Sequence, residues 1–147
     1  MGHAEVERVW PRDGRIRIEG RLHEVTGTAG DRWTAELRGR RDPNRVLRFP
    51  VRVTAGAFDF AFPITELITP RLRAAAPGTR QVWDVFLVRE RDGLRVRAGR
   101  HLDDIADRAE VFVYPAQRAG ENDEFVVRPF YTPDDHLSVR CGKPQSA

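Results

Sequence analysis

The sequence has very little of the residues from which the commonest catalytic and metal sites are built. Its 147 residues include one cysteine, one lysine and two serines, and both serines, Ser138 and Ser146, lie near the end. A single cysteine excludes an internal disulfide and a cysteine-rich zinc site. The scarcity of serine argues against a Ser-His-Asp nucleophile. Cys141 and His136 do not replace it, because residues five apart on a strand point to opposite faces.

Sequence motifs of common enzymes are missing as well. There is no Gly-rich phosphate loop, no His-Glu-x-x-His pair and no nucleophile elbow. We therefore expect a chain that is not an enzyme and has no cofactor, with any transferase activity residing in a separate domain.

Long hydrophobic runs are also absent. No apolar stretch approaches the ~20 residues that span a bilayer, and the first residues do not form a signal-peptide pattern. We expect a protein without a membrane span, located in the cytoplasm and held at the inner membrane surface only through a partner. With 40% hydrophobic and 32% charged residues, the composition predicts one folded domain. We assign residues 5–141 to this domain and residues 142–147 to a frayed tail.

The charge of the chain is carried almost entirely by arginine. There are 25 basic and 22 acidic residues, and because Lys143 is the only lysine, 24 of the basic residues are arginine. This bias is typical of a GC-rich genome. Arginine alternates with acidic residues along most of the chain, which screens any long-range field. A nucleic acid is therefore an unlikely partner, since nucleic-acid-binding proteins usually cluster their positive charge.

Alternation of apolar and polar residues dominates the chain and predicts β-strands. In the segment from Arg15 to Leu22, for example, Ile16 and Ile18 point one way and the charged residues the other. About eight or nine such short strands, separated by turn residues, indicate an all-β fold, and we predict an antiparallel, Ig-like β-sandwich. One short helical segment is predicted near residues 64–75, where Pro70 interrupts a helical spacing of apolar residues.

Three local features add detail to this prediction. Phe58, Phe60 and Phe62 lie on one side of a strand and are expected to form the centre of the core, a ligand platform being the alternative. Pro50 cannot donate to a sheet ladder, so an edge strand or a bulge is expected there. The strand at residues 81–90 is apolar on both faces, so we expect one face to be covered by the opposite sheet and the other by a further element such as the segment at 64–72.

The richest polar cluster of the sequence lies at residues 101–107. It comprises His101, Asp103, Asp104 and Asp107. We interpret it as a helical turn in which an aspartate caps free N–H groups and Asp104 pairs with Arg108. The alternative is a site for Mg²⁺ or Ca²⁺, or a general acid and base.

Several segments carry a resemblance to a known family. They are Gly56–Phe60, Pro63-Ile64 with Leu67, Trp83–Leu87, Leu94–Gly99, His101–Arg108, Val111–Pro115, Arg128–Thr132 and Leu137–Val139. These segments resemble the all-β accessory domains of actinobacterial teichoic-acid-type glycosyltransferases and CDP-glycerol glycerophosphotransferases. The resemblance covers residues 5–141 and includes no transferase domain. It implies an Ig-like accessory sandwich, associated with synthesis of cell-surface polymers, that binds glycan or assembles subunits.

From the residues and this resemblance we expect a non-catalytic module that binds a glycan or polyol-phosphate polymer, or docks a transferase catalytic domain. Exposed arginines grip phosphates through paired hydrogen bonds. The candidate ligand-binding residues on or beside the resembling segments are Arg95, Arg97, Arg100, Arg128 and Tyr131. Two alternatives stay open: a small metal-assisted hydrolase or transferase that uses the 101–107 cluster, and a structural module that self-associates into a homo-oligomer.

Overall fold

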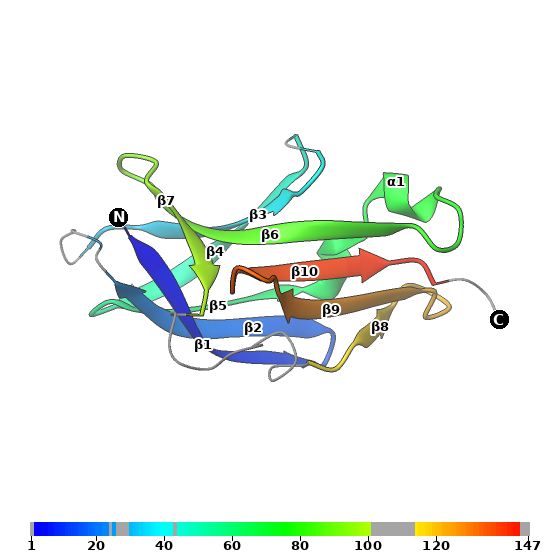
Figure 1. The fold of residues 1–147 in the computed structure, drawn as a ribbon, viewed down its shortest axis with the longest axis horizontal. Coiled ribbons are helices and arrows are strands. Elements are labelled where there is room, and N and C mark those ends of the chain that lie inside the picture. Colours follow the sequence, from blue (N-terminus) through cyan, green and yellow to red (C-terminus); the bar gives the residue numbers. More distant parts are fainter. Residues whose placement is uncertain (1, 24, 26–29, 43, 101–113, 145–147) are drawn as a thin grey trace.

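The computed structural model describes residues 2–23, 25, 30–42, 44–100 and 114–144. Figure 1 shows the ten strands and two short helices that these residues form. The strands are β1 (His3–Arg12), β2 (Arg15–His23), β3 (Trp33–Gly39), β4 (Val46–Thr54), β5 (Ala57–Pro63), β6 (Arg80–Arg89), β7 (Arg95–Gly99), β8 (Gln117–Ala119), β9 (Phe125–Tyr131) and β10 (Leu137–Gly142). The helices are the 3-10 turn η1 (Ile64–Leu67) and α1 (Pro70–Arg73). Neither is long and apolar enough to cross a membrane, and this holds for all helices of the described residues.

Seven strands close into a barrel, which corrects the open β-sandwich predicted from the sequence. Their order around the barrel is β3-β4-β5-β2-β1-β7-β6, and β6 pairs with β3 to complete the ring. The other three strands, β10, β9 and β8, extend from β6 as additional sheet. In Figure 1, β6, β10 and β9 lie side by side while β7 crosses toward β1. The all-β prediction is confirmed, whereas the Ig-like sandwich is wrong.

The barrel closes because two strands change partners along their length. β4 pairs with β3 through residues 46–51 and then with β5 through residues 52–54. β7 pairs with β6 through residues 95–97 and then, in parallel, with β1 through Ala98 and Gly99. β4 therefore joins β3 to β5, and β7 joins β6 to β1, which closes the ring. Alternation of apolar residues shows which side of a strand faces the core but not which strands are neighbours, so the sequence pattern fits both architectures.

The core forms largely where the apolar pattern predicts it. Phe58, Phe60 and Phe62 are buried and stacked, with neighbouring ring centroids 6.3 Å apart, which confirms their place in the core. The predicted helical segment is present as η1 and α1; Pro70 opens α1, and the N–H of Leu72 donates to Oγ1 of Thr69 over 3.1 Å.

Two predictions about single strands have different outcomes. Pro50 pairs with β3, and the pairing of β4 with β5 begins only at Arg52, so within the described residues Pro50 has a strand on one side only, as predicted. The 64–72 segment contacts β6 through Thr69 and Gln81, on the buried face of the strand, so the predicted cover of the outer face by this segment is not what the structure shows. Phe86 lies under the guanidinium groups of Arg95 and Arg97, whose carbons are 5.9 and 5.0 Å from the ring centroid.

Arg97 joins the barrel to the three-stranded extension. One edge of β6 pairs with β10 up to Asp84 and with β7 from Phe86 onward, so its neighbour changes at Val85. At this point Nη1 of Arg97 donates to the carbonyl oxygens of Val85 and Leu137 over 2.9 and 2.7 Å. Its Nη2 donates to Oδ1 of Asp84 over 3.1 Å and to Oγ of Ser138 over 3.0 Å. The guanidinium thus bridges β6, β7 and β10.

We predict that Arg97→Ala destabilises the protein by about 2–4 kcal/mol, because it leaves Asp84 and two carbonyl oxygens without this donor in a partly buried site. Arg97→Lys is expected to recover only part of the loss, since an ammonium group cannot reproduce the planar fork. Urea unfolding of both variants measures the effect. Arg52→Ala is the control, because Arg52 is exposed and such surface changes usually stay within about 0.5 kcal/mol. Equal stabilities of the Arg97 and Arg52 variants would contradict the prediction.

Candidate functional site

The outer face of the sheet formed by β6, β10 and β9 brings together arginines from these three strands. Arg140 on β10 lies directly opposite Arg128 on β9 and Val82 on β6. Arg80 lies two residues before Val82 and therefore points to the same side. Cys141 and Val127, whose side chains point the other way, are fully buried. Directly opposed side chains in antiparallel strands have Cβ atoms about 4.5–5.5 Å apart, and diagonal ones about 7–8 Å, so the three guanidinium groups share one small area.

Two adjoining hollows open on this area. The first encloses about 480 Å³ and is lined by Arg40, Arg41, Arg45, Arg80, Arg140 and Phe130, with Gln81 and Val82. The second encloses about 420 Å³, and its lining includes Arg80, Arg128, Arg140, Lys143 and Val126. Arg80 and Arg140 belong to both. Among the described residues, no acidic side chain lines either hollow. We call this surface the cationic face, and it comprises Arg40, Arg41, Arg45, Arg80, Arg128, Arg140 and Lys143.

Further along the same outer surface, the arginines have counter-ions. Glu36 on β3 and Asp84 on β6 each accept from several guanidinium groups. The pairs with Glu36 are Arg38 at 2.7 Å, Arg95 at 3.1 Å and Arg48 at 3.4 Å; those with Asp84 are Arg40 at 2.9 Å and Arg97 at 3.1 Å. Four arginines that line the hollows differ from these in having no such counter-ion among the described residues. In the described part of the chain, no carboxylate lies within ion-pair distance of Arg41, Arg80, Arg128 or Arg140.

The electrostatics of the cationic face reflect this lack of negative charge. Burial lowers the pKa of Arg140, and the like charges of Arg80 and Arg128 lower it further. Burial also lowers the pKa of Arg45, although the charge of Asp42 opposes the shift. The Nε atoms of Arg45 and Arg128 are buried and have no hydrogen-bond partner among the described residues. Each of these groups would be stabilised by an anion.

Neighbouring groups hold several of these cations in place. The guanidinium of Arg45 lies 4.6 Å from the ring of Trp83, and that of Arg140 lies 5.4 Å from the ring of Phe130. Nζ of Lys143 donates to the carbonyl oxygens of Arg73 and Ala75, over 3.0 and 3.1 Å, at the end of α1. These contacts restrict the side chains before any ligand arrives, which reduces the entropy lost on binding.

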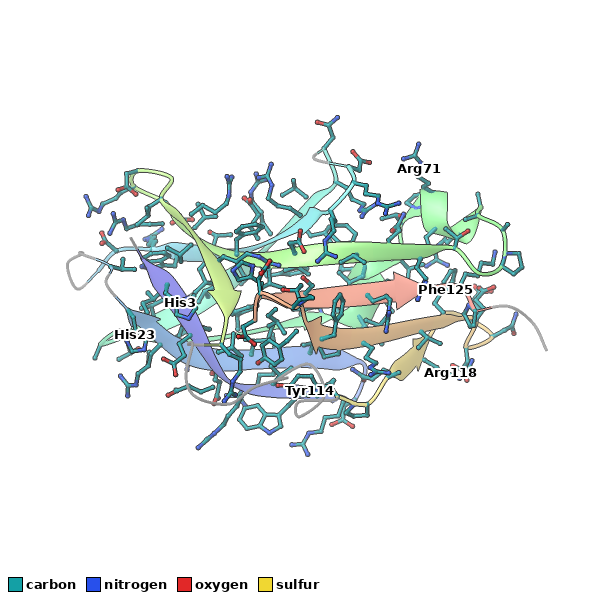
Figure 2. All side chains as sticks on the ribbon, viewed as in Figure 1. His3, His23, Arg71, Tyr114, Arg118 and Phe125 are labelled. Carbon is teal, nitrogen blue, oxygen red and sulfur yellow. The ribbon has the colours of Figure 1, made fainter. Side chains whose placement is uncertain are left out.

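More positive charge flanks this end of the molecule. Figure 2 shows Arg71 projecting from α1 and Arg118 beside β8, both at the end where β10 finishes. Arg71 lies 3.8 Å from Asp42, and Nη1 of Arg118 donates to the carbonyl oxygen of Asp123 over 3.1 Å.

The structure separates the five arginine and tyrosine candidates predicted from the sequence. Arg128 lies on the cationic face. Arg95 pairs with Glu36, and Arg97 pairs with Asp84. The strand pattern predicts that Arg97 faces solvent, but its side chain is only 19% exposed. Tyr131 is buried on the inner face of β9, where its hydroxyl lies 3.3 Å from that of Tyr114, and burial raises its pKa. The backbone N–H of Arg100 donates to the carbonyl oxygen of Asp135. A role of these residues in binding stays a prediction.

The predicted metal candidates His101, Asp103, Asp104 and Asp107 lie outside the described residues. Within the described ranges, no group of three or more His, Cys, Asp or Glu side chains is arranged to hold a metal ion. Cys141 is described: it is fully buried, and burial raises the pKa of its thiol to about 12, so a thiolate nucleophile is not formed at neutral pH.

Sequence reasoning missed most of the cationic face. Alternation along a strand does not separate the two groups of arginines. It places Arg80, Arg128 and Arg140 on an outer face, and it does the same for the arginines that pair with Glu36. Only strand register shows that Arg140 opposes Arg128 and that Glu36 opposes Arg48. The neighbouring Arg40 and Arg41 belong to the segment Arg40-Arg41-Asp42-Pro43-Asn44, whose composition predicts a break between strands but not its position beside β6, where the N–H of Arg40 donates to the carbonyl oxygen of Val82.

The comparisons with known proteins find structural likeness only. No family model matches the chain, and no curated protein matches its sequence. A crystal structure of S. aureus TarS is similar with a TM-score of 0.69 and 19% identity, over 95% of this chain and 24% of the TarS chain. A crystal structure of S. aureus TarS 217–571 is similar with a TM-score of 0.72 and 18% identity, over 99% of this chain and 40% of that one. The chain therefore spans less than half of either TarS chain, and the likeness establishes a shared fold.

We predict that acid weakens the folded state partly through Glu36. Burial by itself raises the pKa of this carboxyl, but the hydrogen bond from Arg38 and the charges of Arg95, Arg38 and Arg48 together lower it. A carboxyl with a depressed pKa stabilises the fold above its unfolded pKa, and that stability is lost as the pH falls through the folded pKa. The unfolding free energy is therefore expected to drop between about pH 5 and pH 2.

The measurement is urea unfolding at a series of pH values for the wild type and Glu36→Gln. The variant is expected to lose less stability over this range, because it has no carboxylate to protonate at this position. Glu121→Gln, at an exposed turn, controls for the loss of one acidic group. Parallel curves for the wild type and Glu36→Gln would contradict the assignment.

Proposed function

We propose that this chain is a non-catalytic accessory module in the synthesis of cell-surface polyol-phosphate or glycan polymers, and that it binds the anionic polymer on its cationic face. The observation that carries the proposal is a group of four arginines that line two hollows and have no carboxylate within ion-pair distance among the described residues: Arg41, Arg80, Arg128 and Arg140. Guanidinium groups bind phosphate through paired, charge-assisted hydrogen bonds. A phosphate-containing polymer supplies the negative charge that the described residues lack there.

The likeness to TarS supports the biological setting. TarS is a teichoic acid glycosyltransferase, and this chain corresponds in fold to a part of it. We infer a comparable placement here, with transferase activity in a separate domain or partner and the present module holding the polymer. The resemblance to actinobacterial accessory domains points the same way. A shared fold is no evidence that this chain has the activity of the whole TarS protein.

Docking of a transferase is the second candidate for the same face. An acidic protein surface would also neutralise the arginines. We favour the polymer because the guanidinium groups line two hollows, whereas protein interfaces of standard size cover about 800 Å² per partner and bury a central apolar patch. Among the apolar residues that border the hollows, Phe130 is already covered by Arg140.

We predict that poly(glycerol phosphate) binds the wild type and that Arg80→Gln or Arg140→Gln lowers the affinity about tenfold each, because one charge-assisted hydrogen bond contributes about 1.5–3 kcal/mol. Isothermal titration calorimetry at physiological salt measures the affinity. Arg21→Gln is the matched control, since it removes one exposed arginine from β2, outside the cationic face.

The controls also separate the alternatives. A neutral glycan of similar length is expected not to bind at the cationic face. If poly(glycerol phosphate) fails to bind the wild type, polymer binding is wrong. If a purified transferase binds instead and Arg80→Gln abolishes that complex, the face is a docking surface.

A further inference from the structure

The cationic face has an internal division that the proposed function does not explain. Its two hollows share Arg80 and Arg140, but each also has cations of its own. Arg40, Arg41 and Arg45 line only the first hollow, and Arg128 and Lys143 line only the second. A single bound anion would occupy one hollow and leave Arg41 of the first hollow, or Arg128 of the second, without a counter-ion among the described residues.

The two shared arginines lie at the boundary between the hollows. Arg140 lies on β10, which runs between β6 and β9. It is directly opposite Arg128 on β9 and diagonally opposite Arg80 on β6. A guanidinium carries five N–H donors in a planar fork, so one such group can donate to oxygens on two sides. Burial lowers the pKa of Arg140, and the like charges of Arg80 and Arg128 lower it further, so negative charge on both sides of Arg140 relieves a repulsion already present in the structure.

We propose that the two hollows are consecutive phosphate subsites, and that the ligand is a flexible phosphodiester chain held through two successive phosphates across Arg80 and Arg140. This inference rests on the proposed function and adds to it the way in which the protein binds the polymer, through two successive phosphates. The chain between the phosphates passes the apolar atoms that border the hollows, Phe130 and Val126.

The same surface favours a polyol-phosphate chain over a nucleic acid. Proteins that bind single-stranded nucleic acid without sequence preference stack bases on aromatic side chains in a basic groove. Phe130 is the aromatic residue among those that line the two hollows, and the guanidinium of Arg140 covers its ring at 5.4 Å. A slender polyol needs no stacking surface, so it fits the hollows as they stand.

If one site contains two phosphate subsites, the affinity is expected to depend steeply on ligand length. Once the first phosphate is bound, the second binds at a high effective concentration set by the short linker. Affinity is therefore expected to rise at least about tenfold when the ligand first reaches both hollows, and to rise only slowly with further repeats.

The experiment titrates the full chain with glycerol phosphate oligomers of increasing length, beginning with glycerol 3-phosphate, at physiological salt. Arg41→Gln removes a cation of the first hollow, and Arg41 is exposed, so this variant is expected to fold. Arg128→Gln removes a cation of the second hollow, and Arg128→Lys keeps the charge there if the glutamine variant is unstable. Arg80→Gln tests the shared boundary, and Arg21→Gln is the control.

The expected result is a step in affinity with length for the wild type and Arg21→Gln. Arg41→Gln and Arg128→Gln are each expected to flatten the step while changing the affinity for glycerol 3-phosphate less than about twofold, because the other hollow still accepts one phosphate. Arg80→Gln is expected to weaken all oligomers.

Three results would overturn the proposal in distinguishable ways. If only one of the two hollow-specific variants matters and no step occurs, a single subsite binds the polymer and the proposed function survives. If no oligomer binds, both proposals fail. If an oligoribonucleotide with the same number of phosphates binds as tightly as the polyol chain, the polyol assignment is wrong.

Discussion

The carboxylate of Asp84 is the contact on which both the architecture and the candidate site depend. It lies on β6 where one edge of that strand changes its neighbour from β10 to β7, and it accepts from Arg97, Arg40 and Ser138. Arg97 in turn reaches carbonyl oxygens of β6 and β10. The same carboxylate lies at the limit of charge compensation on the outer surface. Arg40 pairs with it and also lines the first hollow, whereas Arg80 and Arg140 line both hollows and have no carboxylate within ion-pair distance among the described residues.

The sequence predicts the local structure well because alternation is a property of each strand alone. It places Phe58, Phe60 and Phe62 in the core, Pro50 on a strand with one neighbour and a helical segment around Pro70, as the structure does. It does not predict barrel closure, because closure depends on β4 and β7 changing partners partway along. It also does not distinguish the paired Arg97 from the unpaired Arg140, since both alternate with apolar residues and only strand register brings Asp84 to one of them.

The cationic face spans the junction of the barrel and the extension: Arg128, Arg140 and Lys143 come from the extension, and Arg40, Arg41, Arg45 and Arg80 come from the barrel side. The inner face of the extension buries Val127, Val139 and Cys141, while its outer face concentrates positive charge. A module of this kind can raise the local concentration of a polymer beside a transferase without taking part in the chemistry. The fold that this chain shares with TarS makes up 24% and 40% of the two TarS chains.

The most direct test of this account is an NMR titration that observes the arginine Nε–Hε signals while poly(glycerol phosphate) is added at physiological salt. The account predicts shifts for the arginines of the cationic face, above all Arg80, Arg128 and Arg140, with the signals of Arg38 and Arg97 unchanged because Glu36 and Asp84 already hold them. Uniform small shifts of all exposed arginines, or shifts confined to those paired with Glu36 and Asp84, would contradict it.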